Sequence, residues 1–426
     1  MNTAALAAVG QESFRGNYRI APDHMIGIDR FITDNGEPTL LFSDYQSGVV
    51  RQIFQVADTG FVMGPGFAVK SPAELDIKFE VDANGNVTGA VLTPVNGPKQ
   101  RAEKLKVTET RLDFKSGSAR LSGTLLTPAT AGPHPAIVLL HGSGPLTRYS
   151  FGPYPRFFVS LGFAVLIYDK RGTGESTGEL LDSSTGAPLP LPDDYFPERL
   201  ISDAEAALQL LRQRPGVDPE RIGLWGSSEG GMLATQVAAR DKRVAFVIDS
   251  SGALDPLWET TQYQAGRSLK RLGFSDAQIE MTRAATRAWI NAARTGEGFT
   301  DIMKQRATAL KEKKGWIVGW TRLDITTPEQ LKWYWEHVMS FDPLPQLAMV
   351  KCPILALFGG QDTSTDTASS IAKMRNVLTR AGHPDFTIRL FPNAGHSLSE
   401  EPSGNRMAPA VFQTLRTWLL ERGGQH

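Results

Sequence analysis

The 426-residue sequence has a single cysteine, Cys352, so it can form no intrachain disulfide and no metal site built on several thiolates. Missing disulfides favour the cytoplasm, although some periplasmic proteins also lack them. Lys and Arg together number 45, as do Asp and Glu, which makes the formal net charge zero. A chain without a basic excess carries no electrostatic sign of a nucleic acid partner, and we expect none.

Long apolar runs are also missing. No stretch approaches the roughly 20 apolar residues of a membrane span, so we expect none. Residues 4–9 are apolar, but the segment is short and no Lys or Arg precedes Arg15, so it is not a complete signal peptide. We expect a frayed terminus there, with the remnant of a trimmed signal peptide as the alternative. The length predicts two or three domains.

Residues 1–104 are expected to form an N-terminal all-β domain with its linker. Residues 75–81 alternate apolar and polar side chains, and Asn84-Gly85 is a strong hairpin signal before residues 87–92. Earlier short apolar segments are separated by turn residues, which favours a small antiparallel barrel or sandwich. Residues 94–106 are interpreted as the linker. We expect the domain to be a structural appendage or a homodimer surface rather than a second active site.

Two further stretches, residues 105–252 and 351–426, alternate predicted strands with predicted helices. An antiparallel pair opens the first stretch, and continuous apolar runs typical of strands buried on both faces follow. This alternation predicts an α/β fold with a doubly wound, mostly parallel sheet. The expected strands are residues 110–114, 121–127, 136–140, 164–168, 222–225, 244–248, 353–358 and 386–391; the expected helices are residues 156–161, 199–214, 231–240, 368–381 and 408–421.

Residues 253–350 interrupt this pattern with a helical composition, as an inserted cap would. Six of the eight tryptophans fall in this segment: Trp258, Trp289, Trp316, Trp320, Trp333 and Trp335. We expect most of them to pack the helices of the cap and one or two to line an apolar pocket.

The sequence Gly226-Ser227-Ser228-Glu229-Gly230 lies between a predicted strand and a predicted helix. This is the G-x-S-x-G pattern of a nucleophile elbow, with Ser228 at its centre. The turn is so tight that side chains two residues either side of the serine would not fit. Ser227 does not fit the pattern, because its flanking positions are not glycine. The context predicts that Ser228 is a catalytic nucleophile.

A serine nucleophile needs a base, and the base needs a carboxylate to orient it. Among seven histidines, His396 follows the last predicted strand at its carboxyl end, where such sheets place their ligands. Asp362 follows the strand before it, 34 residues earlier. We therefore predict the triad Ser228, Asp362 and His396, with Asp366 and Asp255 as alternatives to Asp362.

An oxyanion hole requires two backbone N–H donors. We predict the amide of Glu229, whose side chain is interpreted as incidental, and the amide of Ser143, with Gly144 close behind. His141 is expected to brace the loop that carries Ser143 rather than to act in catalysis.

The segment from Asp169 to Ser176 is rich in glycine but does not match a P-loop. Asp169 and Arg171 are interpreted as a pair that stabilises the turn near the mouth of the site.

Five motifs together resemble the α/β-hydrolase superfamily: the segments at 141–144, 169–176, 226–231, 359–362 and 394–396. More narrowly, they are similar to bacterial carboxylesterases and to the serine-aminopeptidase-like and dienelactone-hydrolase-like branches. The resemblance implies hydrolysis through an acyl-enzyme with no cofactor and no metal.

The leading prediction is therefore a carboxylesterase acting on a small-molecule ester, with apolar or aromatic substrates favoured by the tryptophans. A cap-bearing aminopeptidase would need cap carboxylates such as Glu259 and Glu336 to hold a free amine. An acyl-CoA thioesterase or acyltransferase would need basic residues for the nucleotide phosphates, for which Arg267, Arg283 and residues 311–314 are the candidates. A non-catalytic binding protein on the same scaffold is the alternative from another class.

Overall fold

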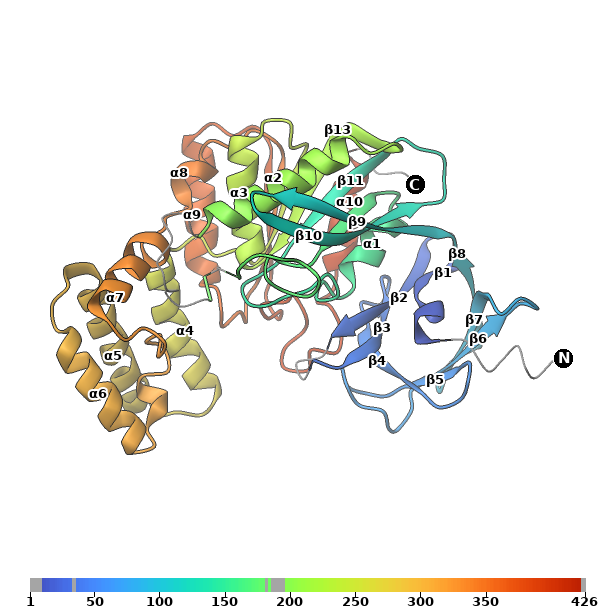
Figure 1. The fold of residues 1–426 in the computed structure, drawn as a ribbon. Helices are drawn as coiled ribbons and strands as arrows, with labels where there is room; N and C mark the ends of the chain where they lie inside the picture. The colour runs from blue at the N-terminus through green and yellow to red at the C-terminus, as the bar shows by residue number, and fades with distance from the viewer. Residues whose placement is uncertain (1–9, 33–35, 181–182, 185–195, 423–426) are drawn as a thin grey trace.

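The computed structural model describes residues 10–32, 36–180, 183–184 and 196–422. The apolar start at residues 4–9 therefore lies outside the described residues. Three parts lie side by side, with a barrel at one end, a sheet covered by helices in the middle and a helical unit at the other end (Figure 1). In the described part of the chain, no helix is both long and apolar enough to cross a membrane.

Eight antiparallel strands form a closed barrel, which identifies the predicted barrel or sandwich as a barrel. Each strand pairs with the next, and β8 pairs back with β1. The rings of Phe14, Phe61 and Phe79 meet inside it, with centroids 4.5 to 5.4 Å apart. The strands are β1 (Gly16–Ala21), β2 (His24–Ile32), β3 (Pro38–Asp44), β4 (Val50–Gln55), β5 (Gly60–Met63), β6 (Leu75–Val81), β7 (Val87–Pro94) and β8 (Gln100–Leu105).

The prediction that residues 94–106 form a linker is wrong, because β8 lies within them and closes the barrel. Its sequence is mostly charged and polar, which hid the strand. Among the residues of β8, only Ala102 is buried, while its neighbours Arg101 and Glu103 are exposed. A strand that needs just one small inward side chain leaves almost no hydrophobic alternation to detect.

The central sheet has eight strands in the order β16-β15-β14-β13-β11-β12-β10-β9. The pairs β9–β10 and β10–β12 are antiparallel, and the remaining neighbours are parallel, so the predicted α/β class is confirmed. Strand β11 is buried at every residue, as expected for a central parallel strand. The strands are β9 (Val107–Ser116), β10 (Ala119–Pro128), β11 (His134–Leu140), β12 (Ala164–Tyr168), β13 (Val217–Ser227), β14 (Val247–Ser250), β15 (Ile354–Gly359) and β16 (Phe386–Phe391).

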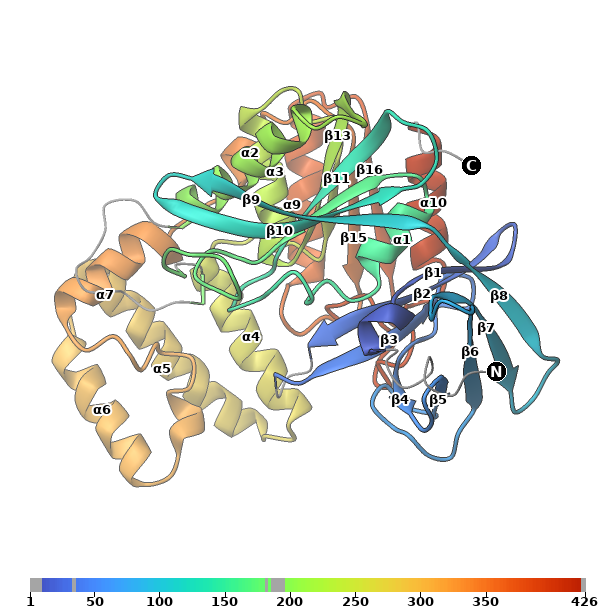
Figure 2. The same cartoon turned by 45° about the vertical axis from the view of Figure 1, so that its right-hand side comes forward.

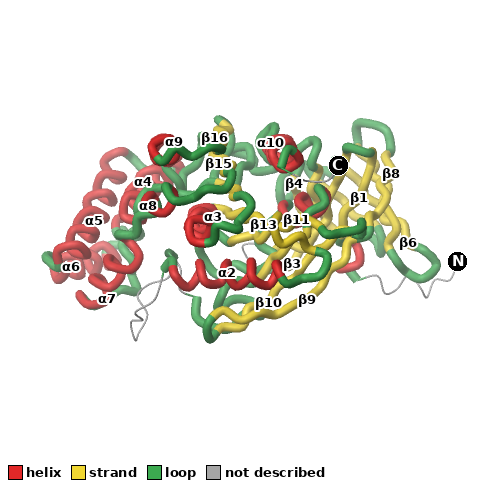
Figure 3. The backbone as a smooth tube through the Cα atoms, turned by 90° about the horizontal axis from the view of Figure 1, so that it is seen from above, coloured by secondary structure: helices red, strands yellow, loops and turns green. Residues whose placement is uncertain are grey.

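Helices cover both faces of this sheet (Figure 3). Side chains of α1 and α10 share one apolar core, and those of α2, α3 and α9 share the other. These helices are α1 (Tyr154–Ser160), α2 (Glu198–Arg212), α3 (Glu229–Arg240), α9 (Thr367–Arg380) and α10 (Val411–Leu420).

The helical unit lies between β14 and β15 in the chain and projects from one end of the sheet (Figure 2). We call it the cap. Trp289 is fully buried inside it, and α5 begins with a capping box in which Ser275 and Gln278 bond each other's backbone. Its elements are α4 (Leu257–Arg271), α5 (Asp276–Thr295), α6 (Phe299–Lys311), η2 (Gly315–Ile317), α7 (Pro328–Tyr334), η3 (Trp335–Met339) and α8 (Leu344–Leu347).

The barrel is attached to the sheet domain through buried charges. Asp29 of β2 accepts hydrogen bonds from Arg156 of α1 at 3.0 Å and from Arg15 at 2.8 Å. Both arginines also contact Glu109 of β9. Asn17 donates to the Arg156 carbonyl at 2.7 Å. The joint thus combines ion pairs with backbone contacts, and it sets the position of the barrel relative to the sheet.

Candidate active site

Ser228 lies on the sharp turn between β13 and α3, with φ 56° and ψ −121°. A non-glycine residue rarely adopts this backbone conformation, which is typical of strained functional turns. A Cβ at Gly226 would lie 2.0 Å from the Gly230 carbonyl oxygen, and a Cβ at Gly230 would lie 2.3 Å from that of Leu140. Both glycines are therefore required by the close approach of backbone, as the pattern predicts.

His396 and Asp362 are joined by a hydrogen bond of 2.8 Å between Nδ1 and Oδ2. The Asp362 side chain is fully buried, and its other oxygen accepts the amides of Ser364 at 2.7 Å and Thr365 at 2.9 Å. A carboxylate only accepts hydrogen bonds, so Nδ1 carries the proton and Nε2 of the neutral ring is left as the acceptor. The hydrogen bond therefore leaves Nε2 as the atom that could accept a proton.

The two alternative carboxylates have other partners. Asp366 caps α9 by accepting the Ser369 amide at 3.1 Å. Asp255 accepts from the Ser369 hydroxyl at 2.6 Å and from the Lys373 ammonium. Neither makes a hydrogen bond to His396 in the described part of the chain, which leaves Asp362 as the carboxylate beside the ring.

Ser228 and His396 line the same cavity. Among the residues that the structure describes, no hydrogen bond joins the Ser228 hydroxyl to the His396 ring. Bonds between a nucleophile and its base are often long until substrate is bound, so the shared cavity rather than a formed bond relates the two side chains.

The loop after β11 lies against the elbow. A Cβ on Gly142 would be 3.4 Å from the Ser228 Cβ, so the residue before Ser143 lies against Ser228. Within the described residues, the backbone N–H groups of Ser143 and Glu229 donate to no protein acceptor. The Glu229 amide is in the first turn of α3, where helix geometry leaves it free. Both predicted oxyanion donors are therefore available.

His141 braces this loop, as predicted. Its Nε2 donates to the Tyr168 carbonyl at 2.6 Å, and its ring stacks on Phe151 with centroids 4.0 Å apart. Burial lowers the pKa of His141 to about 3, so the ring is neutral at physiological pH.

The prediction that the Glu229 side chain is incidental is wrong. Its carboxylate is buried and binds the Lys170 ammonium at 2.8 Å, while its other oxygen accepts the Ser183 amide at 3.0 Å and the Ser183 hydroxyl. Lys170 also donates to the Gly142 carbonyl at 2.8 Å. That carbonyl belongs to the peptide group whose N–H is the Ser143 amide. Lys170 thus contacts the peptide group of one predicted donor and the side chain of the residue that carries the other.

The proposed pairing of Asp169 with Arg171 is also wrong. Asp169 binds Arg148 at 2.7 Å and accepts the Glu175 amide at 2.9 Å. Arg171 instead pairs with Asp203 of α2. Neighbouring side chains in this turn point to different sides, so each finds its partner on another element. Lys170 between them points toward Gly142 and Glu229.

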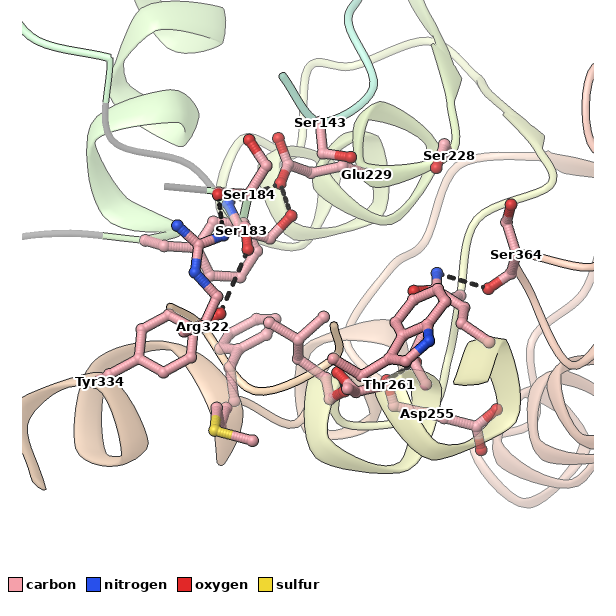
Figure 4. Close-up of a pocket in the computed structure, with 18 of the residues that line it drawn as sticks. Ser143, Ser183, Ser184, Ser228, Glu229, Asp255, Thr261, Arg322, Tyr334 and Ser364 are labelled. Atoms are coloured by element: carbon pink, nitrogen blue, oxygen red, sulfur yellow. Dashed lines mark hydrogen bonds between the residues drawn. The ribbon is translucent and has the colours of Figure 1, made fainter. Parts of the chain in front are cut away.

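One cavity of about 500 Å³ lies between the sheet domain and the cap. Figure 4 shows Ser143, Glu229 and Ser228 along one side of this cap-side cavity, across from Arg322, Tyr334 and Thr261. Trp289 and Trp320 also line it, which confirms the prediction that one or two cap tryptophans face a pocket. Among its described lining residues, every carboxylate is ion-paired: Glu229 with Lys170, Asp255 with Lys373 and Asp324 with Arg322.

A second cavity of about 530 Å³ lies between the sheet domain and the barrel. Its barrel side consists of Phe31, Leu41, Val50 and Phe67, and its other side includes Ser228 and His396. The barrel is thus more than the appendage expected from the sequence, because it walls a cavity that Ser228 also lines. Whether it also forms a homodimer stays a prediction. In the described chain, no group of three or more His, Cys, Asp or Glu is arranged to hold a metal.

A sequence profile of the alpha/beta hydrolase family matches residues 137–406, more than half of the chain. The chain belongs to the α/β-hydrolase family. The match spans the elbow, the cap and His396, so all five motifs that suggested the resemblance lie within it.

Several characterised proteins are similar to this α/β-hydrolase in part. Esterase EstD of Thermotoga maritima is 32% identical over 65% of this chain and 57% of its own length. Thiohydrolase aneE of Aspergillus aculeatus is 37% identical over 30% of this chain and 35% of its own. Quorum-quenching protein AidA of Acinetobacter baumannii is 32% identical over 37% of this chain and 51% of its own length. The chain thus spans about half or less of the length of the last two relatives.

Among solved structures, the acylaminoacyl peptidase of Pyrococcus horikoshii covers 94% of this chain with a TM-score of 0.47 and 18% identity, over 56% of its own chain. An esterase of Pyrococcus furiosus covers 74% of this chain and 90% of its own, with a TM-score of 0.46 and 15% identity.

Two groups of site residues escaped the sequence interpretation. Lys170 stands in a motif at the carboxyl end of β12, the strand next to β11, and this position is the signal that could have marked it. Phe31 and Phe67 of the barrel carry no local signal, because only the docking of two domains brings them near Ser228.

Proposed function

We propose that this α/β-hydrolase cleaves carboxylic esters through an acyl-enzyme formed on Ser228. The observation that carries the proposal is the hydrogen bond between His396 and the buried Asp362 at the wall of the cavity that also contains Ser228. A strained serine, an oriented imidazole and two unused amides are the parts that acyl transfer requires.

In this mechanism His396 Nε2 takes the proton of the Ser228 hydroxyl while Oγ attacks the ester carbonyl. Asp362 holds the tautomer and stabilises the imidazolium that forms. The amides of Ser143 and Glu229 stabilise the tetrahedral oxyanion, with the positive N-terminus of α3 behind it. The protonated ring then releases the alcohol, and a water activated by the same nitrogen releases the acid.

The cap-side cavity argues against an aminopeptidase. Such an enzyme needs a carboxylate free to hold the substrate ammonium, but the described carboxylates of this cavity are already ion-paired. Glu259 and Glu336, the candidates from the sequence, pair with Lys373 and Lys332. The name of EstD supports ester substrates.

A coenzyme A thioester is not favoured either. The basic candidates of the cap, Arg267, Arg283 and residues 311–314, are absent from the described lining of both cavities. A simple thioester presents the same reacting carbonyl, however, and aneE is named a thiohydrolase, so thioesters belong in the substrate panel.

We also propose the division into an N-terminal domain at residues 1–104, a hydrolase domain at 105–252 and 351–426, and a cap at 253–350. It is supported by the end of β8 at Leu105 and by the position of the cap helices between β14 and β15.

The test is intact mass after treatment with a fluorophosphonate, for wild type beside Ser228→Ala, with esters, thioesters and aminoacyl anilides assayed on the same samples. We expect one adduct that the variant lacks, together with ester turnover. Labelling of Ser228 together with turnover of anilides alone would indicate a peptidase rather than an esterase. Neither adduct nor turnover would leave a binding protein on a hydrolase scaffold.

A further inference from the structure

The cap-side and barrel-side cavities meet at the nucleophile. Their described linings share Ser143, Ser228, Gln264 and Ser364, and otherwise differ. A substrate whose carbonyl carbon is at Ser228 Oγ and whose carbonyl oxygen is at the Ser143 amide therefore has one substituent on each side. Each cavity is in the size range of small-molecule sites, about 300 to 1,000 Å³.

The position of His396 distinguishes the two cavities. It lines the barrel-side cavity and, among the described residues, is not part of the cap-side lining. Because Nδ1 is bound to Asp362, only Nε2 can return a proton to the substrate. When the tetrahedral intermediate collapses, the bond from carbon to the alcohol oxygen breaks and that oxygen takes the proton from Nε2. The leaving oxygen must then be within reach of His396.

We propose that the barrel-side cavity binds the leaving alcohol and that the cap-side cavity binds the acyl group. The proposal rests on the proposed function, since it assumes that Ser228 is acylated. It makes the N-terminal barrel a specificity element of the hydrolase, and it assigns selection of the acid and of the alcohol to different domains.

The lining of the barrel-side cavity indicates which alcohol would bind. Phe31 and Phe67 meet edge to face with centroids 5.9 Å apart, and Tyr154 and Trp225 of the sheet domain also line the cavity. No Asp or Glu is among its described lining residues. Its cation, Arg406, pairs with Glu400 at 3.8 Å and bonds the Ser47 carbonyl of the barrel. Aromatic walls without a free charge fit an aromatic or bulky apolar alcohol and disfavour a charged one.

The barrel wall is bonded to the segment that carries the base. Met407, which lies eleven residues after His396 in the chain, donates its amide to the Gly48 carbonyl at 2.7 Å. Val50 donates to the Asn405 carbonyl at 3.1 Å, and Gln52 donates to the Phe67 carbonyl at 2.8 Å. These bonds connect the aromatic wall to the loop after β16. The distance of this wall from His396 Nε2 is therefore set by backbone contacts.

The test crosses two variants with two substrate series. Phe67→Ala removes a ring from the barrel side, and Trp320→Ala removes one from the cap side. One series varies the alcohol of acetate esters from methyl to 2-naphthylethyl, and the other varies the acid of methyl esters from acetate to phenylacetate. We expect Phe67→Ala to lower the preference of kcat/KM for the bulky alcohol about tenfold and to leave acid preference unchanged, as loss of one apolar contact does. Trp320→Ala should do the reverse.

Deacylation gives a second readout. An acyl-enzyme has already lost its alcohol, so Phe67→Ala should hydrolyse a preformed acyl-enzyme at the wild-type rate, while Trp320→Ala should not. Val69→Ala is the matched control, because Val69 follows Phe67 in the same loop, is 43% exposed and does not line the cavity. It should keep the selectivity of the wild type.

The proposal is overturned if Phe67→Ala changes acid preference or deacylation, or if alcohol preference stays at the wild-type value. Failure of the proposed function gives a different result, since wild type itself would then form no adduct on Ser228. Circular dichroism of Phe67→Ala compared with Val69→Ala identifies a folding defect, and in that case Phe67→Leu, which keeps an apolar side chain, should show an intermediate alcohol preference.

Discussion

The barrel and the cap both wall a cavity at Ser228, but they contact the hydrolase domain through different chemistry. At the barrel joint Arg156 and Asp29 have 2% and 10% of their side chains exposed. At the far end of α4 in the cap, Arg271 binds Glu401 at 3.0 Å with 57% and 24% exposed. Asp255 and Glu259 of the cap also pair with Lys373 of α9, whose side chain is 29% exposed. Tyr263 and Gln264 add single hydrogen bonds to backbone carbonyls.

This difference has an energetic consequence. A buried ion pair is costly to break, because the remaining charge has lost its water and gained no partner. A partly exposed pair can exchange its partner for solvent at little cost. The barrel wall should therefore be much more sensitive to loss of a single charge than the cap wall.

The largest loss of stability is expected from a substitution that breaks the barrel joint. Arg156→Met leaves Asp29 with Arg15 alone in a buried setting and should destabilise the protein by about 3–5 kcal/mol. Arg271→Met at the cap should cost about 1 kcal/mol or less. Urea unfolding followed by tryptophan fluorescence measures both. Equal losses for the two variants would contradict the comparison.

The stability of the sheet domain should depend on pH through Asp249 on β14. Burial raises the pKa of Asp249 to about 7, from 3.8 in the unfolded chain. The folded state thus binds more protons between pH 4 and 7, and stability contributed by the neutral form is lost as pH rises through this window. Asp249→Asn stays neutral and should gain stability relative to wild type from pH 4 to pH 8, by up to about 4 kcal/mol.

Thermal unfolding of both proteins across this pH range measures that gain. Parallel curves for wild type and Asp249→Asn would show that the carboxyl does not titrate in the folded state as expected.

Behind the predicted oxyanion donors, Lys170→Met should impair catalysis more than substrate binding. It removes the ammonium from the Gly142 carbonyl and should lower kcat about a hundredfold with little change in KM, as loss of oxyanion stabilisation does. Affinity for a trifluoromethyl ketone, which forms an oxyanion on the serine, should fall in parallel.

The control is the double variant Lys170→Met with Glu229→Gln, which leaves no unpaired carboxylate. It should regain stability without regaining kcat. Recovery of both would make Lys170 a structural residue only.

The smallest effect is expected at the cap. Tyr263→Phe removes a hydrogen bond of 2.8 Å to the Asp362 carbonyl and should cost about 1 kcal/mol, with kcat lowered no more than about threefold. Steady-state kinetics beside urea unfolding checks this. A loss of stability as large as that of Arg156→Met would mean that the cap stabilises the loop of Asp362 as strongly as the buried ion pairs stabilise the barrel joint.

Local signals in the sequence were sufficient for the parts of the site that depend on chain geometry. The elbow at Ser228 requires glycine on both sides because backbone atoms occupy the space. Asp362 and His396 each follow a parallel strand, and the carboxyl ends of such strands share one edge. Their hydrogen bond is consistent with a prediction that used only order and spacing.

Contacts between distant segments could not be predicted in this way. The closure of the barrel by β8, the pairing of Arg171 with Asp203 and the approach of Lys170 to Glu229 join residues 32 to 88 positions apart. No periodicity records such partners, because any buried charge can pair with any opposite charge that the fold brings near.

The sequence by itself determined the α/β class and the residue types at the candidate active site, since strand periodicity and the steric limits of a tight turn are local properties. Only the tertiary structure decided that a barrel more than 100 residues before Ser228 walls one side of the site and that a cap walls the other. Those walls arise from domain docking, in which buried charges and shape act together over the whole molecule.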